Sequence, residues 1–312
     1  MGARRGARVD RGVSAMLSGR AIAEPVASGA PSAHNLDGAY AYCARLARSH
    51  YENFTIASWL MPRAMRPHMY AIYAYARMAD DFADEEHDLA KLDGWERELD
   101  LAYAGAPRHP VFVALADTAS RFDIPCEPFA DLLRAFRSDV DFKGFETIED
   151  VLGYCRYSAN PVGRLVLYLF GYRDSERQEL SDRICSGLQL ANFWQDVAID
   201  RGKGRIYIPR RDLERFGYTV EDLDRGVVNR NFIELMKHEV AFARELLKSG
   251  AALSRLVDWR LRRDILMFAG GGLAILHAIE KIGYDVFRRR PKLGKLDYLK
   301  LGWHALAGRV EV

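Results

Sequence analysis

Proline is absent from two long stretches of the chain, and this absence most limits the folds that the chain can adopt. No proline occurs between Pro161 and Pro209, or between Pro209 and Pro291. Proline breaks a helix because it lacks a backbone N–H and its ring clashes with the preceding turn, so both stretches permit long helices. Apolar residues also recur with helical spacing in two sets: Val111, Phe112, Leu115, Ala119, Phe122 and Phe232, Leu235, Met236, Ala243, Leu246.

Strand signals are lacking, because apolar and polar residues do not alternate and no Asn-Gly hairpin dipeptide occurs. The 312 residues are 49% apolar, as in an ordinary globular protein. We therefore expect one all-α domain over residues 38–300 and a C-terminal tail over residues 301–312. Residues 1–37 contain no aromatic residue and are rich in Ala, Gly, Ser and Arg. They are interpreted as a disordered extension; a start at Met16 and an organelle transit peptide are the alternatives.

Several classes of protein are disfavoured by composition. The net charge of +2 and the scattered basic residues do not indicate a nucleic-acid partner. The longest apolar run, Ile265 to Ile279, is shorter than the roughly 20 residues of a membrane span, so a buried core helix is predicted there. The cysteines show no C-x-x-C pair, which favours free thiols in a reducing compartment and a cytoplasmic location. They are Cys43, Cys126, Cys155 and Cys185.

An acidic stretch follows the helical run from Arg66 to Met78. Asp80 and Asp84 are four residues apart, so in a helix their carboxylates share one face. The two charges repel by about 0.2–0.5 kcal/mol, and a bound cation would turn this repulsion into affinity. Mg²⁺ is commonly held by one or two carboxylates together with substrate phosphates. Taken alone, the stretch is more typical of a solvated helix end than of a metal site.

A second element repeats the spacing of four. Asn192, Asp196 and Asp200 would lie on one face over about 12 Å of helix. Their neighbours are apolar, including Phe193 and Trp194, so a solvated face does not explain them. Two polar stripes on two helices indicate metal ions held between facing helices of a bundle.

The chain resembles the squalene/phytoene synthase family, on four ordered motifs between about His50 and Arg290. The first is Tyr73-x-x-x-Arg77-x-x-Asp80-Asp81-x-x-Asp84, and the second runs from Tyr154 to Gly163 as Y-C-R-Y-S-A-N-P-V-G. The third is Leu188-Gln189-Leu190-x-Asn192-x-x-x-Asp196-x-x-x-Asp200, and the fourth is Gly204-Arg205-Ile206-Tyr207-Ile208-Pro209. The resemblance implies a single-domain helical bundle of the isoprenoid-synthase type with a central prenyl-binding cavity.

The segment from Ser49 to Arg63 is most similar to hydroxysqualene synthases of the bacterial hopanoid pathway. Condensing members of the family typically carry serine hydroxyls here, which meet a substrate diphosphate. Tyr51 and Asn53 hold those places in this chain. This difference fits a protein that takes presqualene diphosphate, which is already condensed.

The resemblance also implies residue roles. A cluster of Mg²⁺ would be held by Asp80, Asp84, Asn192, Asp196 and Asp200, and no NADPH is expected. The predicted catalytic residues are Asp80, Asp84, Asp196, Asp200, Tyr51 and Asn53. The predicted substrate-binding residues are His50, Phe54, Tyr73, Arg77, Tyr154, Gln189, Asn192 and Arg290.

Those roles follow from residue chemistry. Arg77 and Arg290 would each contact the diphosphate through a planar guanidinium. For Arg290 the alternative is that Arg288 to Arg290 form a basic tail on the surface. Aromatic faces stabilise cations, which suits Tyr73, Tyr154, Phe54 and Tyr51, although core packing explains most aromatic residues of the chain. Gln189 and Asn192 would place amide groups near the cation. His50, Tyr51 and Asn53 are able to hold the quenching water.

Two further features admit two interpretations each. Ala159, Gly163 and the run Gly270 to Gly272 leave room for prenyl tails or permit close helix packing. The segment from Arg201 to Pro209 is a flap over the diphosphate or a solvated connector.

The predicted function is Mg²⁺-dependent conversion of presqualene diphosphate and water to hydroxysqualene and diphosphate. The alternatives are a condensing enzyme that joins two allylic diphosphates and a non-catalytic prenyl-diphosphate-binding subunit. The expected partners are the lipid diphosphate, pathway enzymes and, because the substrate is a lipid, a membrane surface contacted transiently.

Overall fold

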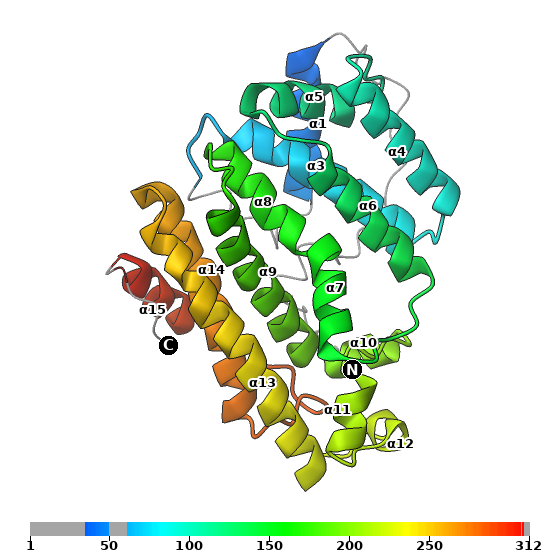
Figure 1. The fold of residues 1–312 in the computed structure, drawn as a ribbon, viewed down its shortest axis with the longest axis vertical. Coiled ribbons are helices and arrows are strands. Elements are labelled where there is room, and N and C mark those ends of the chain that lie inside the picture. Colours follow the sequence, from blue (N-terminus) through cyan, green and yellow to red (C-terminus); the bar gives the residue numbers. More distant parts are fainter. Residues whose placement is uncertain (1–34, 50–60, 307, 309–312) are drawn as a thin grey trace, which may run out of the picture.

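The computed structural model describes residues 35–49, 61–306 and 308 of the chain. The described residues form helices and their connections, and no strand occurs among them (Figure 1). The predicted all-α fold is therefore confirmed. The four cysteines are free thiols, as predicted.

The first half of the chain forms a layer of helices at one end of the molecule (Figure 1). Its helices are α1 (Leu36–Ser49), α3 (Arg66–Asp84), α4 (Leu89–Tyr103), α5 (Pro110–Phe122) and α6 (Glu127–Val140). Proline stands in the first turn of α3, α5 and α6, where its missing N–H costs nothing. Asp88 caps α4 by accepting a hydrogen bond from the Lys91 backbone N–H at 3.1 Å.

The second half of the chain is arranged around α9, which contacts α7, α8, α10, α13 and α14. The helices here are α7 (Ile148–Ser158), α8 (Asn160–Leu169), α9 (Ser175–Gln195), α10 (Val197–Gly202), α11 (Arg210–Arg215), α12 (Val220–Asp224), α13 (Arg230–Gly250), the 3₁₀ helix η2 (Ala251–Arg255), α14 (Trp259–Lys281) and α15 (Lys295–Leu306). The two proline-free stretches thus contain the long helices α9, α13 and α14, as expected.

The apolar side chains form two clusters, one in each half, and both are contacted by Val166 and Phe170 of the α8 region. The predicted core helix from Ile265 to Ile279 lies within α14. Within the described part of the chain, every helix is too short or too polar to cross a membrane. Residue 300, where the domain was expected to end, lies inside α15, whose Leu301 is buried and contacts α14 near Gly270.

The helix predicted through Asn192, Asp196 and Asp200 is interrupted. Asp196 has φ −108° and ψ 15°, so α9 ends at Gln195 and α10 begins at Val197. The backbone bonds from Asp196 N to Asn192 O and from Asp200 N to Asp196 O are nevertheless both 2.9 Å. The spacing of four residues per turn is therefore kept across the bend.

Candidate active site

The last two turns of α3 carry the first group of carboxylates around a buried arginine. Arg77 is 2% exposed, and its Nη1 lies 3.2 Å from Asp80 Oδ2. Arg77 also forms ion pairs with Asp81 and, at 3.5 Å, with Glu85. Because the C-terminal end of a helix carries negative partial charge, carboxylates there need a cation, and Arg77 supplies it. Burial and the neighbouring Asp84 charge raise the pKa of Asp80 well above its usual range.

Asp84 points to the segment between α10 and α11. Arg205 Nη2 lies 2.8 Å from Asp84 Oδ1, and Arg205 Nη1 lies 3.4 Å from Asp84 Oδ2. Beside this pair, Asp139 of α6 accepts a hydrogen bond from the Tyr154 hydroxyl at 3.1 Å. Burial raises the pKa of Asp139 to about 7, against the opposing charge of Arg205. Neither Arg205 nor Asp139 was predicted from the sequence as a site residue, although Arg205 stands in the fourth motif.

Asp196 meets Arg290 across 94 residues of sequence. Arg290 donates to both carboxylate oxygens of Asp196, from Nε at 2.5 Å and from Nη2 at 2.9 Å. The Gln195 amide holds the adjoining segment by donating to the Pro291 carbonyl at 2.6 Å. Arg288, by contrast, is 85% exposed and lies near Asp285. Arg290 is therefore the member of the arginine triplet that faces the acidic residues, and the interpretation as a surface tail does not describe it.

Asp200 and Asn192 complete the second stripe. Burial raises the pKa of Asp200 to about 7, with contributions in the same direction from Asp196 and from Asp84 across the site. The charge of Asp84 on α3 thus acts on Asp200 of α10, and a shared metal site stays a prediction. The Asn192 side-chain oxygen is buried and has no hydrogen-bond partner among the described residues.

The donor chemistry of these residues fits Mg²⁺, which prefers oxygen ligands. The raised pKa values of Asp80 and Asp200 reflect buried carboxyl groups that a cation would stabilise as carboxylates. Among residues 35–49, 61–306 and 308, however, no three Asp, Glu, His or Cys side chains are grouped closely enough to hold one ion. Asp84 and Asp196 have arginine partners instead.

An apolar cavity of about 170 Å³ begins one turn from these charges and lies where the two apolar clusters meet. Tyr73 and Ala76 of α3 line it just before Arg77, and Gln189 of α9 lines it just before Asn192. Further lining residues come from α8, α9, η2 and α14 and include Val162, Leu188, Leu253, Leu261, Ile265 and Phe268. The predicted central cavity is thus present, beside the acidic and basic residues.

Tyr154 does not line this cavity. Its ring packs 5.6 Å from that of Phe145 and 6.3 Å from that of Phe193, measured between ring centroids. Phe193 in turn stacks on Tyr207 at 3.8 Å with an interplanar angle of 8°. Tyr154 therefore reaches the site through its hydroxyl, which orients Asp139.

The small residues were interpreted either as leaving room for prenyl tails or as permitting close helix packing, and the structure places them differently. Ala159 and Gly163 line the cavity. Gly270 and Gly272 do not, because a Cβ at Gly272 would lie 2.8 Å from Leu247 Cδ1 and one at Gly270 would lie 3.0 Å from Leu301 Cδ2. Of the two interpretations of this glycine run, close helix packing therefore applies to these two positions.

The segment from Arg201 to Pro209 is exposed at residues 202–204 and contacts the site through Arg205 and Tyr207. Arg205 binds Asp84, and Tyr207 is 8% exposed against Phe193. Arg201 forms an ion pair with Asp224 of α12. The interpretation of this segment as a flap over the diphosphate stays a prediction. The predicted residues His50, Tyr51, Asn53 and Phe54 lie outside the described residues.

Comparison with known proteins matches the squalene/phytoene synthase family over residues 47–297. The chain is 32% identical to the 15-cis-phytoene synthase of Synechocystis over 305 residues, which cover 90% of this chain and 89% of that protein. It is 35% identical to the hydroxysqualene synthase of Sinorhizobium fredii over 263 residues, which cover 82% of this chain and 88% of that protein.

Solved structures share the fold. A squalene synthase from Alicyclobacillus acidocaldarius has a TM-score of 0.78 and 45% identity, covering 80% of this chain and 95% of its own. A dehydrosqualene synthase with a bound ligand has a TM-score of 0.81 and 27% identity, covering 87% of this chain and 96% of its own. The sequence motifs, the helical fold and these matches agree, and the chain belongs to the squalene/phytoene synthase family of isoprenoid synthases.

Proposed function

We propose that the protein is a hydroxysqualene synthase, which converts presqualene diphosphate and water to hydroxysqualene and diphosphate. The observation that carries the proposal is the cluster of carboxylates and arginines at the end of an apolar cavity, with Tyr73 and Gln189 between the two. An apolar tail and a diphosphate head require these two environments side by side. The choice of presqualene diphosphate is supported by the identity of 35% to a hydroxysqualene synthase and 45% to a solved squalene synthase.

Two arginines are placed to bind the diphosphate. Arg205 and Arg290 each use two nitrogens on one carboxylate, and the same fork geometry suits phosphate oxygens. We infer that the incoming diphosphate replaces Asp84 and Asp196 as their partner. Arg77 remains buried among the carboxylates of α3 and fixes their orientation.

The released carboxylates, with Asp80, Asp200 and Asn192, would then hold Mg²⁺. The bound ion supplies Lewis-acid stabilisation of the negative charge on the departing diphosphate. The carbon–oxygen bond breaks with its electron pair going to diphosphate, and the carbon skeleton is left as a cation. The arginines balance the diphosphate charge in a site that is largely withdrawn from water.

The cavity residues govern the fate of the cation. The apolar walls exclude bulk water, and the Tyr73 ring offers a π face to positive charge. One water oxygen then forms the new carbon–oxygen bond and loses a proton, which gives the alcohol. His50, Tyr51 and Asn53 stay the predicted holders of this water. Because water rather than hydride quenches the cation, the reaction needs no NADPH.

The location follows from the substrate. We infer a cytoplasmic enzyme that contacts a membrane surface to exchange its lipid substrate and product. A condensing activity is the second candidate, because phytoene synthases match at 32% identity over 90% of this chain. A non-catalytic prenyl-diphosphate binder is the third.

Product analysis distinguishes the three. Purified protein with Mg²⁺ is given presqualene diphosphate or farnesyl diphosphate, without NADPH. Hydroxysqualene from presqualene diphosphate, with no condensation of farnesyl diphosphate, is the expected result. Joining of two farnesyl diphosphates would favour the condensing enzyme, and release of diphosphate from neither substrate would favour the binder.

A further inference from the structure

The most exposed large apolar side chains of the described residues belong to α14 and α15. Trp303 and Leu296 are each 73% exposed on α15, and Trp259 is 63% exposed in the first turn of α14. Tryptophan is the largest apolar side chain, so two exposed indoles on packed neighbouring helices mark an interaction surface.

The packing of the two helices brings these residues to one region. On α15, Leu296, Lys300 and Trp303 share one outward side, spaced by four and three residues, while Leu301 and Ala305 are buried. A Cβ at Gly270 would lie 3.0 Å from Leu301, and one at Gly308 would lie 2.8 Å from Arg262. The two helices are therefore antiparallel, and α15 ends beside the first turn of α14. We call Trp259, Leu296, Trp303 and the cations beside them the α14–α15 surface.

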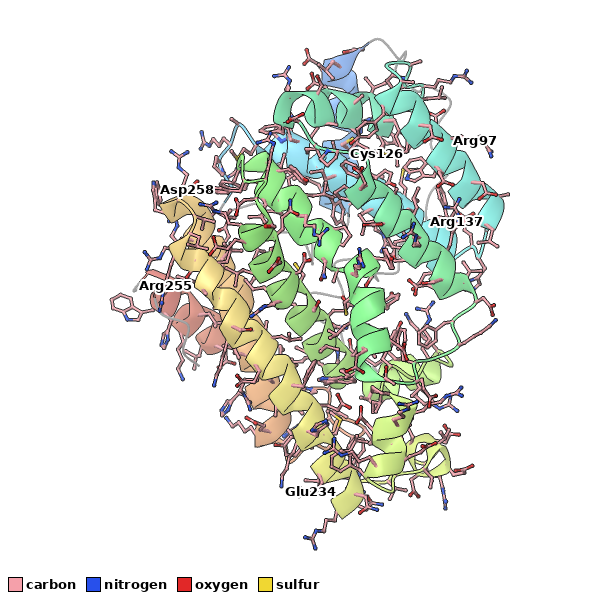
Figure 2. All side chains as sticks on the ribbon, in the orientation of Figure 1. Arg97, Cys126, Arg137, Glu234, Arg255 and Asp258 are labelled. Carbon is pink, nitrogen blue, oxygen red and sulfur yellow. The ribbon has the colours of Figure 1, made fainter. Side chains whose placement is uncertain are left out.

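The cations of this surface are Arg255, Arg260, Arg262, Arg263 and Lys300. The guanidiniums of Arg260 and Arg263 lie 5.4 Å and 4.8 Å from the Trp259 ring centroid. Figure 2 shows Arg255 and Asp258 at the edge of the molecule where α14 begins, far from Arg97 on α4.

The acidic side chains of the surface are engaged in helix ends. Asp258 accepts hydrogen bonds from the Arg260 and Leu261 backbone N–H groups at 2.7 Å and 3.1 Å. Asp297 accepts one from the Gly294 N–H at 2.7 Å. The charge presented outward is therefore predominantly positive, beside two indoles.

The positive charge of the α14–α15 surface distinguishes between three possible binding partners: residues 1–34, a second copy of the chain and a membrane. Residues 1–34 carry five arginines against one Asp and one Glu, so this segment is itself cationic. A second copy joined by a two-fold axis would place arginines against arginines. An anionic phospholipid surface complements both features, because tryptophan partitions to the headgroup level and arginine pairs with phosphate.

The cavity lies on the other side of the same helix. Leu261, Ile265 and Phe268 of α14 line it, and Leu253 of η2 lines it beside Arg255. We propose that the α14–α15 surface docks onto a bilayer containing anionic phospholipid, so that the α14 wall of the lipid cavity faces the membrane. This proposal deepens the membrane contact inferred above and rests on it, but its test measures vesicle binding rather than turnover.

Vesicle binding by the full chain tests the proposal. The protein is mixed with vesicles made of phosphatidylcholine alone or of phosphatidylcholine together with phosphatidylglycerol. The fraction of protein bound to each is measured by flotation. Binding to the anionic vesicles is expected to exceed binding to the neutral ones by at least about tenfold and to weaken with salt. Leu296→Ser with Trp303→Ser, and separately Arg255→Glu with Arg260→Glu, should each lower it by about tenfold or more.

Matched variants away from the surface serve as controls. Leu89→Ser with Val220→Ser changes apolar residues that are 48% and 41% exposed, and Arg97→Glu with Arg108→Glu makes the same charge change elsewhere. Both should bind vesicles as the unchanged protein does. A conservative pair, Trp259→Phe with Trp303→Phe, should keep binding but lose fluorescence quenching by brominated lipid.

Three outcomes would overturn the proposal. Equal binding by the surface variants and the controls would place the contact elsewhere. If Leu296→Ser with Trp303→Ser abolished a dimer in solution but did not change vesicle binding, the surface would be an interface with a second copy of this chain. Absence of binding to anionic vesicles would exclude a membrane. Turnover of detergent-dispersed substrate, measured on the same variants, tests the proposed reaction separately and should be unchanged.

Discussion

Asp264 is a carboxyl group in the wall of a largely apolar cavity. It is 5% exposed, and its Oδ1 has no hydrogen-bond partner among the described residues. Burial raises the pKa of Asp264 to about 7, against the opposing charge of Arg263. The folded protein therefore holds a proton on this group at pH values where the unfolded chain has lost it.

We expect Asp264→Asn to change the pH dependence of stability. With a folded pKa above the unfolded one, the contribution of Asp264 is complete below about pH 4 and is lost as the pH rises to about 7. Asparagine cannot ionise, so at pH 8 the variant should be more stable than the unchanged protein by about 1–3 kcal/mol. Urea unfolding at pH 5 and pH 8 measures this. Asp123→Asn, at a side chain that is 88% exposed, should keep the original slope, and a parallel slope for Asp264→Asn would contradict the argument.

Because Arg290 is paired with Asp196 and Arg288 is exposed, we expect alanine substitutions at these two arginines to have different effects on turnover. Arg290→Ala should lower the kcat/KM of diphosphate release by at least about 100-fold, because it removes a charged partner from a site that excludes water. Arg288→Ala, at an 85% exposed side chain, should leave it unchanged. Equal effects of the two changes would mean that the pairing seen here has no part in turnover.

Asp80→Asn and Asp196→Asn test the carboxylates themselves. Each should abolish diphosphate release, since amide oxygen is a weaker ligand for a hard cation than carboxylate. The melting temperature of Asp80→Asn should stay within a few degrees, because Asp80 is a buried acid whose neutral form the fold favours. Retained activity in either variant would refute the metal assignment.

At the scale of elements, the glycines of α14 decide how closely the helices approach. Gly272 faces α9 and α13, where an added Cβ would lie 2.9 Å from Leu188 Cδ2 and 2.8 Å from Leu247 Cδ1. An added Cβ at Gly271 would meet nothing within 4 Å. Two adjacent residues of one helix thus have opposite relations to the core.

We expect opposite effects of the same substitution at these two positions. Gly272→Ala should lower the free energy of unfolding by about 1–3 kcal/mol, since the leucines around it must shift. Gly271→Ala should raise it by about 0.5–1 kcal/mol, because alanine favours the helix and nothing opposes its methyl group. Urea denaturation of both variants measures the difference. Stabilisation by Gly272→Ala would show that the α9–α14 contact is looser than described.

At the scale of the molecule, the cavity exists because two apolar clusters meet without filling the space between α3, α8, α9 and α14. Packing alone would close such a space, since interiors are normally as dense as organic crystals. The unfilled volume, with the charged residues at its end, is the feature that the proposed reaction uses.

Filling the cavity should therefore affect turnover more than stability. Ala159→Phe is expected to lower the kcat/KM for presqualene diphosphate by at least about tenfold, because the ring takes space that the lipid needs. The melting temperature should not fall by more than a few degrees. Ala90→Phe, on the exposed side of α4, provides the control and should change neither quantity. Unchanged kinetics of Ala159→Phe would place the lipid elsewhere.

The sequence by itself determined the helices and the two polar stripes. Helical spacing is a local property, so α5 and α13 could be predicted from apolar residues three and four apart, and α14 from its continuous apolar run. The same spacing placed Asp80 with Asp84, and Asn192 with Asp196 and Asp200. The motifs were sufficient to identify the family.

Only the tertiary structure decided the partners of those residues. Arg205 meets Asp84 across 121 residues of sequence, and Arg290 meets Asp196 across 94. Asp139 joins them from α6, which carries neither of the two predicted stripes, and Gly272 serves packing rather than the cavity. The physical reason is that side-chain contacts between distant segments depend on how whole helices cross, which local periodicity does not encode.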